Sequence, residues 1–253
     1  NSNLGNSAYN YLTNERKLSK NIIEEFELGF APDSWTGLYE YLLKVKGFSY
    51  DAILNAGLII SKDNKNKVFD RFRNRLMVPI YDSQSRVVAF TGRTLDGSNP
   101  KYLNSPETDV FEKGKILYGF DKASSNIRKK DLAIVVEGNF DVISLHAKGI
   151  NNCVAAQGSS LSKYQISQLC RCTDNKNIVI NFDSDNAGIS ATKRIIAEVE
   201  SLSLNHQINL KILQLRGFKD PDEYLNQNSA VDYFNLIDNA CFWIDWELDQ
   251  IFF

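Results

Sequence analysis

Acidic side chains stand at the ends of three predicted strands. Glu137 comes directly after the apolar run LAIVV, and Asp183 and Asp185 come after NIVINF. Asp220 and Asp222 lie in RGFKDPDE, after the run INLKILQL. Ligands of open parallel sheets bind where the chain leaves the carboxyl ends of the strands. We therefore expect these acids to lie near one another at one edge of a sheet.

Four of these acids occur in pairs, and pairing points to metal binding. The D-x-D spacing of Asp183 and Asp185 places two carboxylates on the same side of a strand-like turn, and hard divalent cations prefer oxygen ligands. Like charges so close together would repel one another without a cation between them. A single Asp after a strand is commonly a helix N-cap, and D-P-D is a turn formula. Capping does not explain pairs, so metal binding is the better interpretation.

Strands and helices alternate along the sequence from residue 131. Strands are predicted over LAIVV, NNCVAAQ, NIVINF and INLKILQL, and helices over FDVISLHAKG, SKYQISQLCRCT and AGISATKRIIAEVES. This alternation implies an α/β fold with a mostly parallel sheet flanked by helices on both faces. Residues 220–253 are predicted to form two or three acidic amphipathic helices.

A different pattern precedes this sheet. Residues 1–60 have apolar residues at three-to-four spacing, interrupted at Gly29, Pro32 and Gly47, which predicts short helices. The β-rich runs RLMVPIYD and RVVAFTGR, separated by the turn-forming cluster DSQS, predict a hairpin. The polar segment TLDGSNPKYLNSPETDVFEKGK is predicted to be a long loop. Because apolar residues punctuate it, we expect this loop to be functional rather than disordered.

The composition excludes several classes of protein. Apolar residues make up 43% and charged residues 24% of the 253 residues, which excludes a disordered chain. No apolar run approaches the roughly 18 residues of a membrane span. The polar start NSNLGNSAYN lacks the pattern of a signal peptide. The four cysteines include one C-x-C pair and no second pair at zinc spacing, so we expect no zinc site and a reducing, intracellular compartment.

The net charge of -2 conceals an uneven distribution along the chain. Residues 62–130 carry 15 Lys and Arg against 8 Asp and Glu, whereas residues 220–253 carry eight acidic side chains and no basic one. A basic region of this kind suits polyanions such as nucleic acid or nucleotide phosphates. A salt-bridged surface is the alternative interpretation.

Several short sequences occur in the order of a known family. E-G-N-F-D-V, F-D-S-D-N-A-G and K-D-P-D-E resemble the Toprim domain shared by primases, topoisomerases and some nucleases. RFRNRLMVPIYDSQSRVVAFTGR, PKYLNSPETDVFEKGKILYGFDKA and RKLSKNIIEEFELGFAPDSW are similar to the polymerase core of bacterial DnaG-type primases. The resemblance implies an N-terminal basic α/β subdomain over residues 1–130, a central Toprim metal-binding subdomain over 131–216 and a C-terminal helical subdomain over 217–253.

The resemblance also assigns roles to individual residues. The family's metal-binding acids fall on Glu137, Asp183, Asp185, Asp220 and Asp222, of which the first three are the expected catalytic residues. The residues that hold nucleotide phosphates or template in the family fall on Arg16, Arg71, Arg73, Arg75, Arg93, Lys101, Asn104 and Lys113. Arg71, Arg73 and Arg75 alternate in the sequence, so they are predicted to lie along one side of a strand. Asn139 stands where the family has an aromatic residue, but none of the acids is lost.

The activity implied by the resemblance is that of a DNA primase, a DNA-directed RNA polymerase of the primosome. Short RNA primers would be made from NTPs on single-stranded DNA during replication by two-metal nucleotidyl transfer. Two or more Mg²⁺ or Mn²⁺ ions would activate the attacking 3′-hydroxyl and stabilise the leaving pyrophosphate. Arg93, Lys101 and Lys113 would hold the triphosphate of the incoming nucleotide.

The implied partners are the single-stranded template, NTPs and the RNA–DNA hybrid product. The implied location is the bacterial cytoplasm at the nucleoid, or the stroma of a plastid. The zinc-binding and helicase-binding modules of the family have no counterpart in the sequence. We therefore expect contact with the replicative helicase only through a domain absent here, and no contact with a membrane.

Two other functions remain open. A Toprim nuclease would use the same acids to activate water, but it would not need the basic hairpin and the PKYLNSPET loop for a triphosphate. A non-catalytic module that binds nucleic acid or nucleotides would be favoured if the acids proved dispersed in space. A topoisomerase is disfavoured, because Tyr164 and Tyr233 have no context for a covalent DNA linkage.

Overall fold

The sheet predicted after residue 131 is present in the computed structural model of the chain, which describes residues 5–62, 67–158, 160–206 and 208–252. The chain divides into two units. The first comprises residues 1–80 and 86–112, and the second comprises residues 81–85 and 113–253. The finer division at residues 130 and 216 stays a prediction.

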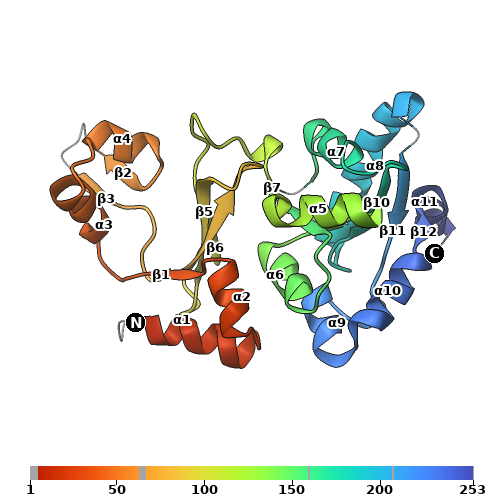
Figure 1. The fold of residues 1–253 in the computed structure, drawn as a ribbon, viewed down its shortest axis with the longest axis horizontal. Coiled ribbons are helices and arrows are strands. Elements are labelled where there is room, and N and C mark those ends of the chain that lie inside the picture. The colour runs from red at the N-terminus through yellow and green to blue at the C-terminus, as the bar shows by residue number, and fades with distance from the viewer. Residues whose placement is uncertain (1–4, 63–66, 159, 207, 253) are drawn as a thin grey trace. The chain divides into compact units, whose positions relative to one another are not determined.

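The second unit is built on a six-stranded sheet with the order β12-β11-β10-β8-β9-β7 (Figure 1). Its four central strands are parallel: β8 (Ala133–Val136), β9 (Cys153–Ala156), β10 (Asn177–Asn181) and β11 (Asn209–Ile212). The short edge strands β7 (Leu117–Tyr118) and β12 (Cys241–Phe242) are antiparallel to their neighbours. The prediction of a mostly parallel sheet is therefore confirmed, and the continuous apolar runs reflect burial on both faces.

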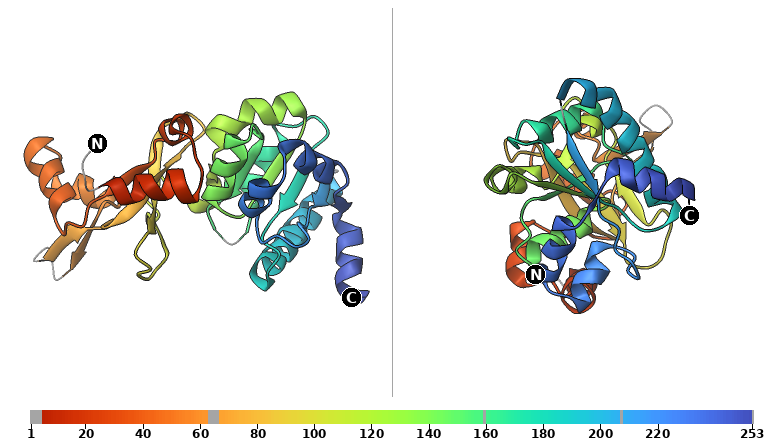
Figure 2. Two further views of the ribbon diagram at one scale, coloured as in Figure 1. Left: turned by 90° about the horizontal axis from the view of Figure 1, so that it is seen from below. Right: turned by 90° about the vertical axis from the view of Figure 1, so that its right-hand side faces the viewer.

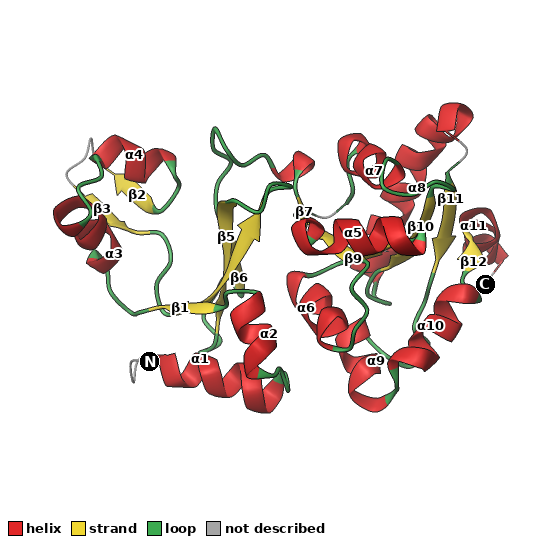
Figure 3. Cartoon of the chain, in the orientation of Figure 1, coloured by secondary structure: helices red, strands yellow, loops and turns green. Residues whose placement is uncertain are grey.

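Helices follow or precede each central strand, as the colouring by secondary structure in Figure 3 shows. They are α5 (Phe120–Lys130), α6 (Asn139–Ala147), α7 (Lys163–Cys170), α8 (Asn186–His206), α9 (Pro221–Gln227), α10 (Ala230–Asp238) and α11 (Trp243–Phe252). The last three confirm the predicted helical ending, whereas β12 between them was not predicted.

Alternate residues of the strands face opposite sides of this sheet. Val135 and Ile180 belong to a buried cluster that includes Ile166 of α7 and Ile195 of α8. The residue after each of these strand residues points to the other face of the sheet. There, the hydroxyl of Tyr233 from α10 donates a 2.7 Å hydrogen bond to the Asn181 side chain.

Helix α11 is anchored near its start, where Trp243 packs against the sheet's buried cluster and Trp246 belongs to it. Trp246 is 2% exposed and belongs to the sheet's buried cluster, whereas Ile251 and Phe252 are each 75% exposed. Figure 2 shows the end of this helix, in dark blue, projecting beyond the sheet. Among the described residues, no helix is both long enough and apolar enough to cross a membrane.

The first unit contains two small sheets. One has the order β1-β4-β5-β6, with β1 (Gly29–Ala31), β4 (Arg75–Tyr81), β5 (Val87–Thr94) and β6 (Tyr102–Asn104). The other pairs β2 (Ile59–Lys62) with β3 (Lys67–Asp70) in antiparallel register. Strands β4 and β5 are neighbours joined by a turn, in which the Ser85 N–H donates to the Asp82 carbonyl, so the predicted hairpin is confirmed.

Short helices precede these sheets, as predicted. They are α1 (Asn6–Asn10), α2 (Lys20–Glu25), α3 (Gly37–Glu40) and α4 (Tyr50–Asn55), and π-helical turns over Tyr11–Glu15 and Tyr41–Val45 extend α1 and α3. Ser19 and Ser49 cap α2 and α4 by accepting backbone hydrogen bonds from Ile22 and Ala52. The helical periodicity hid the short strands β1 and β2.

Two local predictions before residue 116 were wrong. The segment predicted as a long loop contains β6 and a 3₁₀ turn over Lys113–Lys115. Arg71 and Arg73 lie between β3 and β4, and only Arg75 lies on a strand. Asn74 has a positive φ of 47°, which interrupts the extended backbone that the alternating arginines suggested.

Candidate metal and nucleotide site

The five predicted acids follow three strands that are neighbours in the sheet. Glu137 follows β8, Asp183 and Asp185 follow β10, and Asp220 and Asp222 begin α9 after β11. Since these three strands are parallel, their carboxyl ends meet at the same edge of the sheet. The structure thus places the five acids in one region of the second unit, as the sequence predicted.

The charges of these acids act on one another. Burial raises the pKa of Asp183 to about 6, and the charges of Glu137, Asp220 and Asp185 add to this rise, while Lys219 opposes it. Burial also raises the pKa of Glu137, and the charge of Asp185 raises it further. Desolvation and like-charge repulsion therefore both disfavour the ionised carboxylates of this cluster in the absence of a cation.

Glu137 has one carboxylate oxygen, Oε2, that is buried and has no hydrogen-bond partner among the residues that the structure describes. The backbone of Asp183 supplies a hydrogen bond to the carboxylate, which lowers its pKa and partly offsets the effect of burial. A buried, unpartnered carboxylate oxygen is costly unless another group satisfies it.

Two of the acids also cap helices, as the alternative interpretation held. The Asp185 Oδ1 atom accepts 2.9 Å hydrogen bonds from the backbones of Ala187 and Gly188 at the start of α8. The Asp220 Oδ1 atom accepts a 2.8 Å bond from the backbone of Glu223 in α9. Asp185 and Asp220 therefore cap helices and also belong to the acid cluster.

Asp141 in the first turn of α6 is a member of this cluster that the sequence analysis missed. It is 8% exposed, and burial, followed by the charges of Asp220, Asp183 and Asp222, raises its pKa to about 8. Its Oδ2 atom accepts a 2.9 Å hydrogen bond from the Gly138 backbone. Its position four residues after Glu137 in E-G-N-F-D, one turn into the helix, was the signal that could have revealed it.

Asp222 is held by the helix that carries Asp141. The Ser144 hydroxyl of α6 donates a hydrogen bond to the Asp222 Oδ1 atom of α9. The exposed Lys219 places its Nζ atom 3.8 Å from Asp183 Oδ2, at the loop before α9. Helices α6 and α9 therefore fix two acids of the cluster relative to each other.

The donor set fits a divalent cation in chemistry. Among the residues that the structure describes, no three His, Cys, Asp or Glu side chains are placed closely enough to hold one ion together. Separate hydrogen bonds hold these acids: Asp185 and Asp220 bond to the first turns of α8 and α9, and Asp222 bonds to Ser144 of α6. The partly desolvated carboxylates, their mutual repulsion and the unpartnered Glu137 oxygen are nevertheless the features that a hard cation would satisfy.

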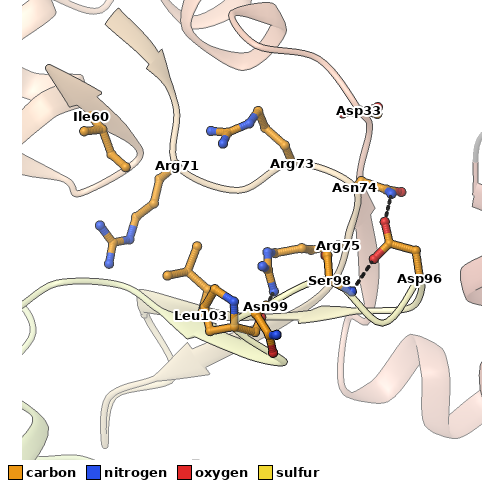
Figure 4. A pocket seen from close by; sticks show the side chains of 11 residues that line it. Asp33, Ile60, Arg71, Arg73, Asn74, Arg75, Asp96, Ser98, Asn99 and Leu103 are labelled. Atoms are coloured by element: carbon orange, nitrogen blue, oxygen red, sulfur yellow. Dashed lines mark hydrogen bonds between the residues drawn. The ribbon is translucent and has the colours of Figure 1, made fainter. Parts of the chain in front are cut away.

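Three of the predicted basic residues line one pocket of the first unit (Figure 4). The pocket has a volume of about 370 Å³, and Arg71, Arg73 and Arg75 lie along it with Asn74 and Asp96. Hydrogen bonds from Thr94 and Ser98 lower the pKa of Asp96, so this side chain is a carboxylate. It accepts a 2.8 Å bond from the Asn74 amide. The pocket lining therefore carries three arginines against two acids, Asp33 and Asp96.

The three arginines are held by backbone carbonyls and an aromatic ring. Arg71 donates to the Asn104 carbonyl from both Nε and Nη2, at 3.1 and 2.7 Å. Arg75 is buried and its Nη1 atom donates to the carbonyls of Gly92 and Pro100. Arg73 lies 4.2 Å from the ring centroid of the exposed Trp35. Burial lowers the pKa of Arg71 and Arg75.

Three more of the predicted binding residues lie around two tyrosines of the first unit. The Arg93 guanidinium lies 4.4 Å from the Tyr11 ring centroid and 5.7 Å from that of Tyr102. Arg16 donates to the Tyr11 hydroxyl, and Lys101 lies 5.8 Å from the Tyr102 ring centroid. These contacts bring together three cations from distant parts of the sequence.

Asn104 and Lys113 complete the predicted set. The Asn104 Oδ1 atom accepts a 2.9 Å hydrogen bond from Thr91, and its carbonyl accepts from Arg71. Asn104 therefore links β6 to β5 and to the arginine pocket. Lys113 lies in the 3₁₀ turn at the beginning of the second unit's long segment.

The chain matches known families over most of its length. Residues 1–124 match the model of the DNA primase catalytic core, N-terminal domain, and residues 134–225 match a Toprim-like model. The solved Escherichia coli primase catalytic core is 33% identical with a TM-score of 0.87, over 99% of this chain and 78% of that one. The chain belongs to the DnaG primase catalytic core family.

Other members of this family are also similar. The DNA primase of Synechococcus elongatus is 49% identical over 98% of this chain, which spans 36% of that relative's length. A solved DnaG primase catalytic domain, described as bound to single-stranded DNA, is 33% identical with a TM-score of 0.84, over 95% of this chain and 74% of that one. The fold expected from the resemblance is thus confirmed.

Proposed function

We propose that this chain is the catalytic core of a DNA primase that makes short RNA primers from NTPs on single-stranded DNA. The observation that carries the proposal is the group of acids at the ends of neighbouring parallel strands, where burial and then the charges of neighbouring acids raise the pKa of Glu137, Asp141 and Asp183. Membership of the primase family and the relative bound to single-stranded DNA support the choice of reaction.

In this proposal the acids hold two or more Mg²⁺ or Mn²⁺ ions. The residues that would hold them are Glu137, Asp183, Asp185, Asp220 and Asp222, with Asp141 beside them. Bound ions supply positive charge that favours deprotonation of the 3′-hydroxyl and stabilises the leaving pyrophosphate. The protein's own contribution is to position the acids: β8, β10 and α9 fix their backbones, and Ser144 orients Asp222.

The cations of the first unit would bind phosphates. Arg93 and Lys101 would bind nucleotide phosphates by charge-assisted hydrogen bonds, and the same role is proposed for Lys113 of the second unit. Arg71, Arg73 and Arg75 would contact the template's phosphates from the pocket in Figure 4, and the exposed Trp35 beside Arg73 offers a ring for base stacking. The nucleophile is the substrate's hydroxyl, so the reaction requires no nucleophilic side chain.

A primer-synthesis assay tests this function. The protein is incubated with single-stranded DNA, NTPs and Mn²⁺, and labelled oligoribonucleotides are expected. Asp183→Asn and Asp185→Asn should each abolish synthesis, while Asp249→Asn, which changes an exposed acid of α11, should leave it unchanged. Undiminished product from both cluster variants would reject the metal role, cleavage of the DNA would indicate a nuclease, and binding without turnover would indicate a non-catalytic module.

A further inference from the structure

Gln165 of α7 is a buried amide that bonds to the turn carrying Lys113. It is 1% exposed. Its Nε2 atom donates to the carbonyls of Lys113, at 3.0 Å, and Ile116, at 2.7 Å. Its Oε1 atom accepts a 2.9 Å bond from the backbone of Ser162, the N-cap of α7. All of these atoms belong to the second unit.

Ser162 makes a second connection to the same turn. Its hydroxyl donates to the Gly114 carbonyl and accepts from the Gln165 backbone at 3.2 Å. The backbone carbonyls of residues 113, 114 and 116 therefore all accept hydrogen bonds from side chains at the start of α7. The conformation of the turn is set by this helix as well as by its own sequence.

Capping alone does not require an amide at position 165. In a capping box the third helical residue needs only an oxygen acceptor, which glutamate supplies as well as glutamine. The Nε2 donors of Gln165 satisfy carbonyls of the half-buried residues Lys113 and Ile116, which would otherwise lose these partners. The part of the side chain that capping does not use is the part that contacts the turn.

We infer that Gln165 is a positioning residue that fixes the Lys113 turn for binding of the nucleotide triphosphate. The inference rests on the proposed function, in which Lys113 contacts phosphate. Gln165 itself is too deeply buried to touch substrate, so it acts through the backbone of the turn. Charge-assisted phosphate contacts depend on placement, and a small displacement of the ammonium group weakens them.

Gln165→Glu separates the two tasks of this residue. Glutamate retains the capping acceptor but replaces the two donated hydrogen bonds by repulsion between its oxygen and the carbonyls of Lys113 and Ile116. We expect the Kd for ATP in the presence of Mn²⁺ and the KM for NTPs to rise about tenfold, the effect of losing one to two hydrogen bonds. The kcat at saturating NTP should change less than twofold.

A matched control removes a cap elsewhere. Ser229→Ala breaks the capping box of α10, which Ser229 forms with Asp232 and which does not contact the Lys113 turn. It should lower the melting temperature without changing the Kd for ATP. If Gln165→Glu does not fold cooperatively, Gln165→Met, which is uncharged and of similar size, is measured in the same way.

A double-mutant cycle with Lys113→Ala decides whether Gln165 acts through Lys113. In the Lys113→Ala background, Gln165→Glu should cause no further rise in the Kd for ATP. An equal rise in both backgrounds, or no rise in the single variant, would overturn the inference while leaving the proposed function intact. If Lys113→Ala itself leaves the Kd unchanged, the inference fails together with the nucleotide role of Lys113. If the wild type makes no primers in the synthesis assay, the proposed function itself is refuted.

Discussion

The backbone of Asp183 donates a hydrogen bond to the Glu137 carboxylate, and the charge of Glu137 raises the pKa of the Asp183 side chain. The two residues end neighbouring parallel strands, β8 and β10. The same pair is thus joined by an attractive contact through the backbone and a repulsive one between side chains. The sheet holds the acids together against this repulsion, which a bound cation would relieve.

This relationship predicts that Glu137→Gln stabilises the metal-free protein. The variant removes one charge from the cluster and should raise the melting temperature in EDTA, while primer synthesis falls at least a hundredfold. Stability gained at the cost of activity is typical of a functional site. Thermal unfolding and the synthesis assay measure the two effects. A variant that melts lower in EDTA and retains full activity would contradict this account of Glu137.

Binding of Mn²⁺ should stabilise the wild type by mass action. At a concentration about 100 times the Kd, the expected increase in unfolding free energy is about 2.7 kcal/mol. Glu137→Gln and Asp183→Asn should reduce this increase, and Asp249→Asn should not. The measurement is a melting curve at rising Mn²⁺, with the same protein in EDTA as the metal-free reference. An identical increase in all four proteins would place the ion outside the acid cluster.

Arg73 should contribute to DNA affinity through both charge and stacking. Its guanidinium lies 4.2 Å from the Trp35 ring centroid and lines the pocket of Figure 4. Arg73→Ala should weaken binding of single-stranded DNA and reduce the salt slope of log K by about 0.7, the value for one phosphate contact. Arg73→Lys should keep the slope and lose part of the affinity. Arg128→Ala, which changes an exposed cation of α5, serves as the control in fluorescence anisotropy titrations.

The sequence predicted the acid cluster because strand ends are visible in the alternating pattern. Apolar runs before Glu137, Asp183 and Asp220 mark buried parallel strands, and parallel strands bring their carboxyl ends to one edge. Asp141 was missed because it lies on a helix, where burial rather than sequence position decides its role.

The basic region was less predictable. The spacing of Arg71, Arg73 and Arg75 imitates a strand, but the positive φ of Asn74 ends the extended backbone between them. The Asp70 side chain accepts hydrogen bonds from the backbones of Leu38 and Tyr39, a contact between residues more than thirty positions apart. Such tertiary contacts determine where β3 ends, and neither periodicity nor composition reports them.

Gly188 should be intolerant of a side chain. A Cβ atom at this position would lie 2.0 Å from the Asp183 carbonyl oxygen, so the loop that carries Asp183 and Asp185 would have to move. Gly188→Ala should destabilise the protein by about 1–3 kcal/mol, the usual cost of overpacking, and should impair synthesis. Gly29→Ala, whose Cβ would meet nothing within 4 Å, is the matched control in urea unfolding. Equal effects of the two substitutions would argue against a tight loop.

His146 should make the protein less stable in mild acid. Burial, opposed by the Cys153 carbonyl and assisted by the charge of Lys122, lowers the pKa of this buried histidine from 6.5 to about 4. Between these pH values the unfolded chain binds a proton that the folded chain does not, so stability falls as the pH falls from 6.5 toward 4. The full difference corresponds to about 3 kcal/mol.

Acids with raised pKa values change stability in the opposite direction as the pH falls, so the test compares wild type with His146→Gln by urea unfolding at several pH values. The wild type should lose stability relative to the variant only below about pH 6.5, because histidine is neutral in both states above it. A difference independent of pH would show that His146 has the same pKa in the folded and unfolded chains, which would contradict the lowered pKa.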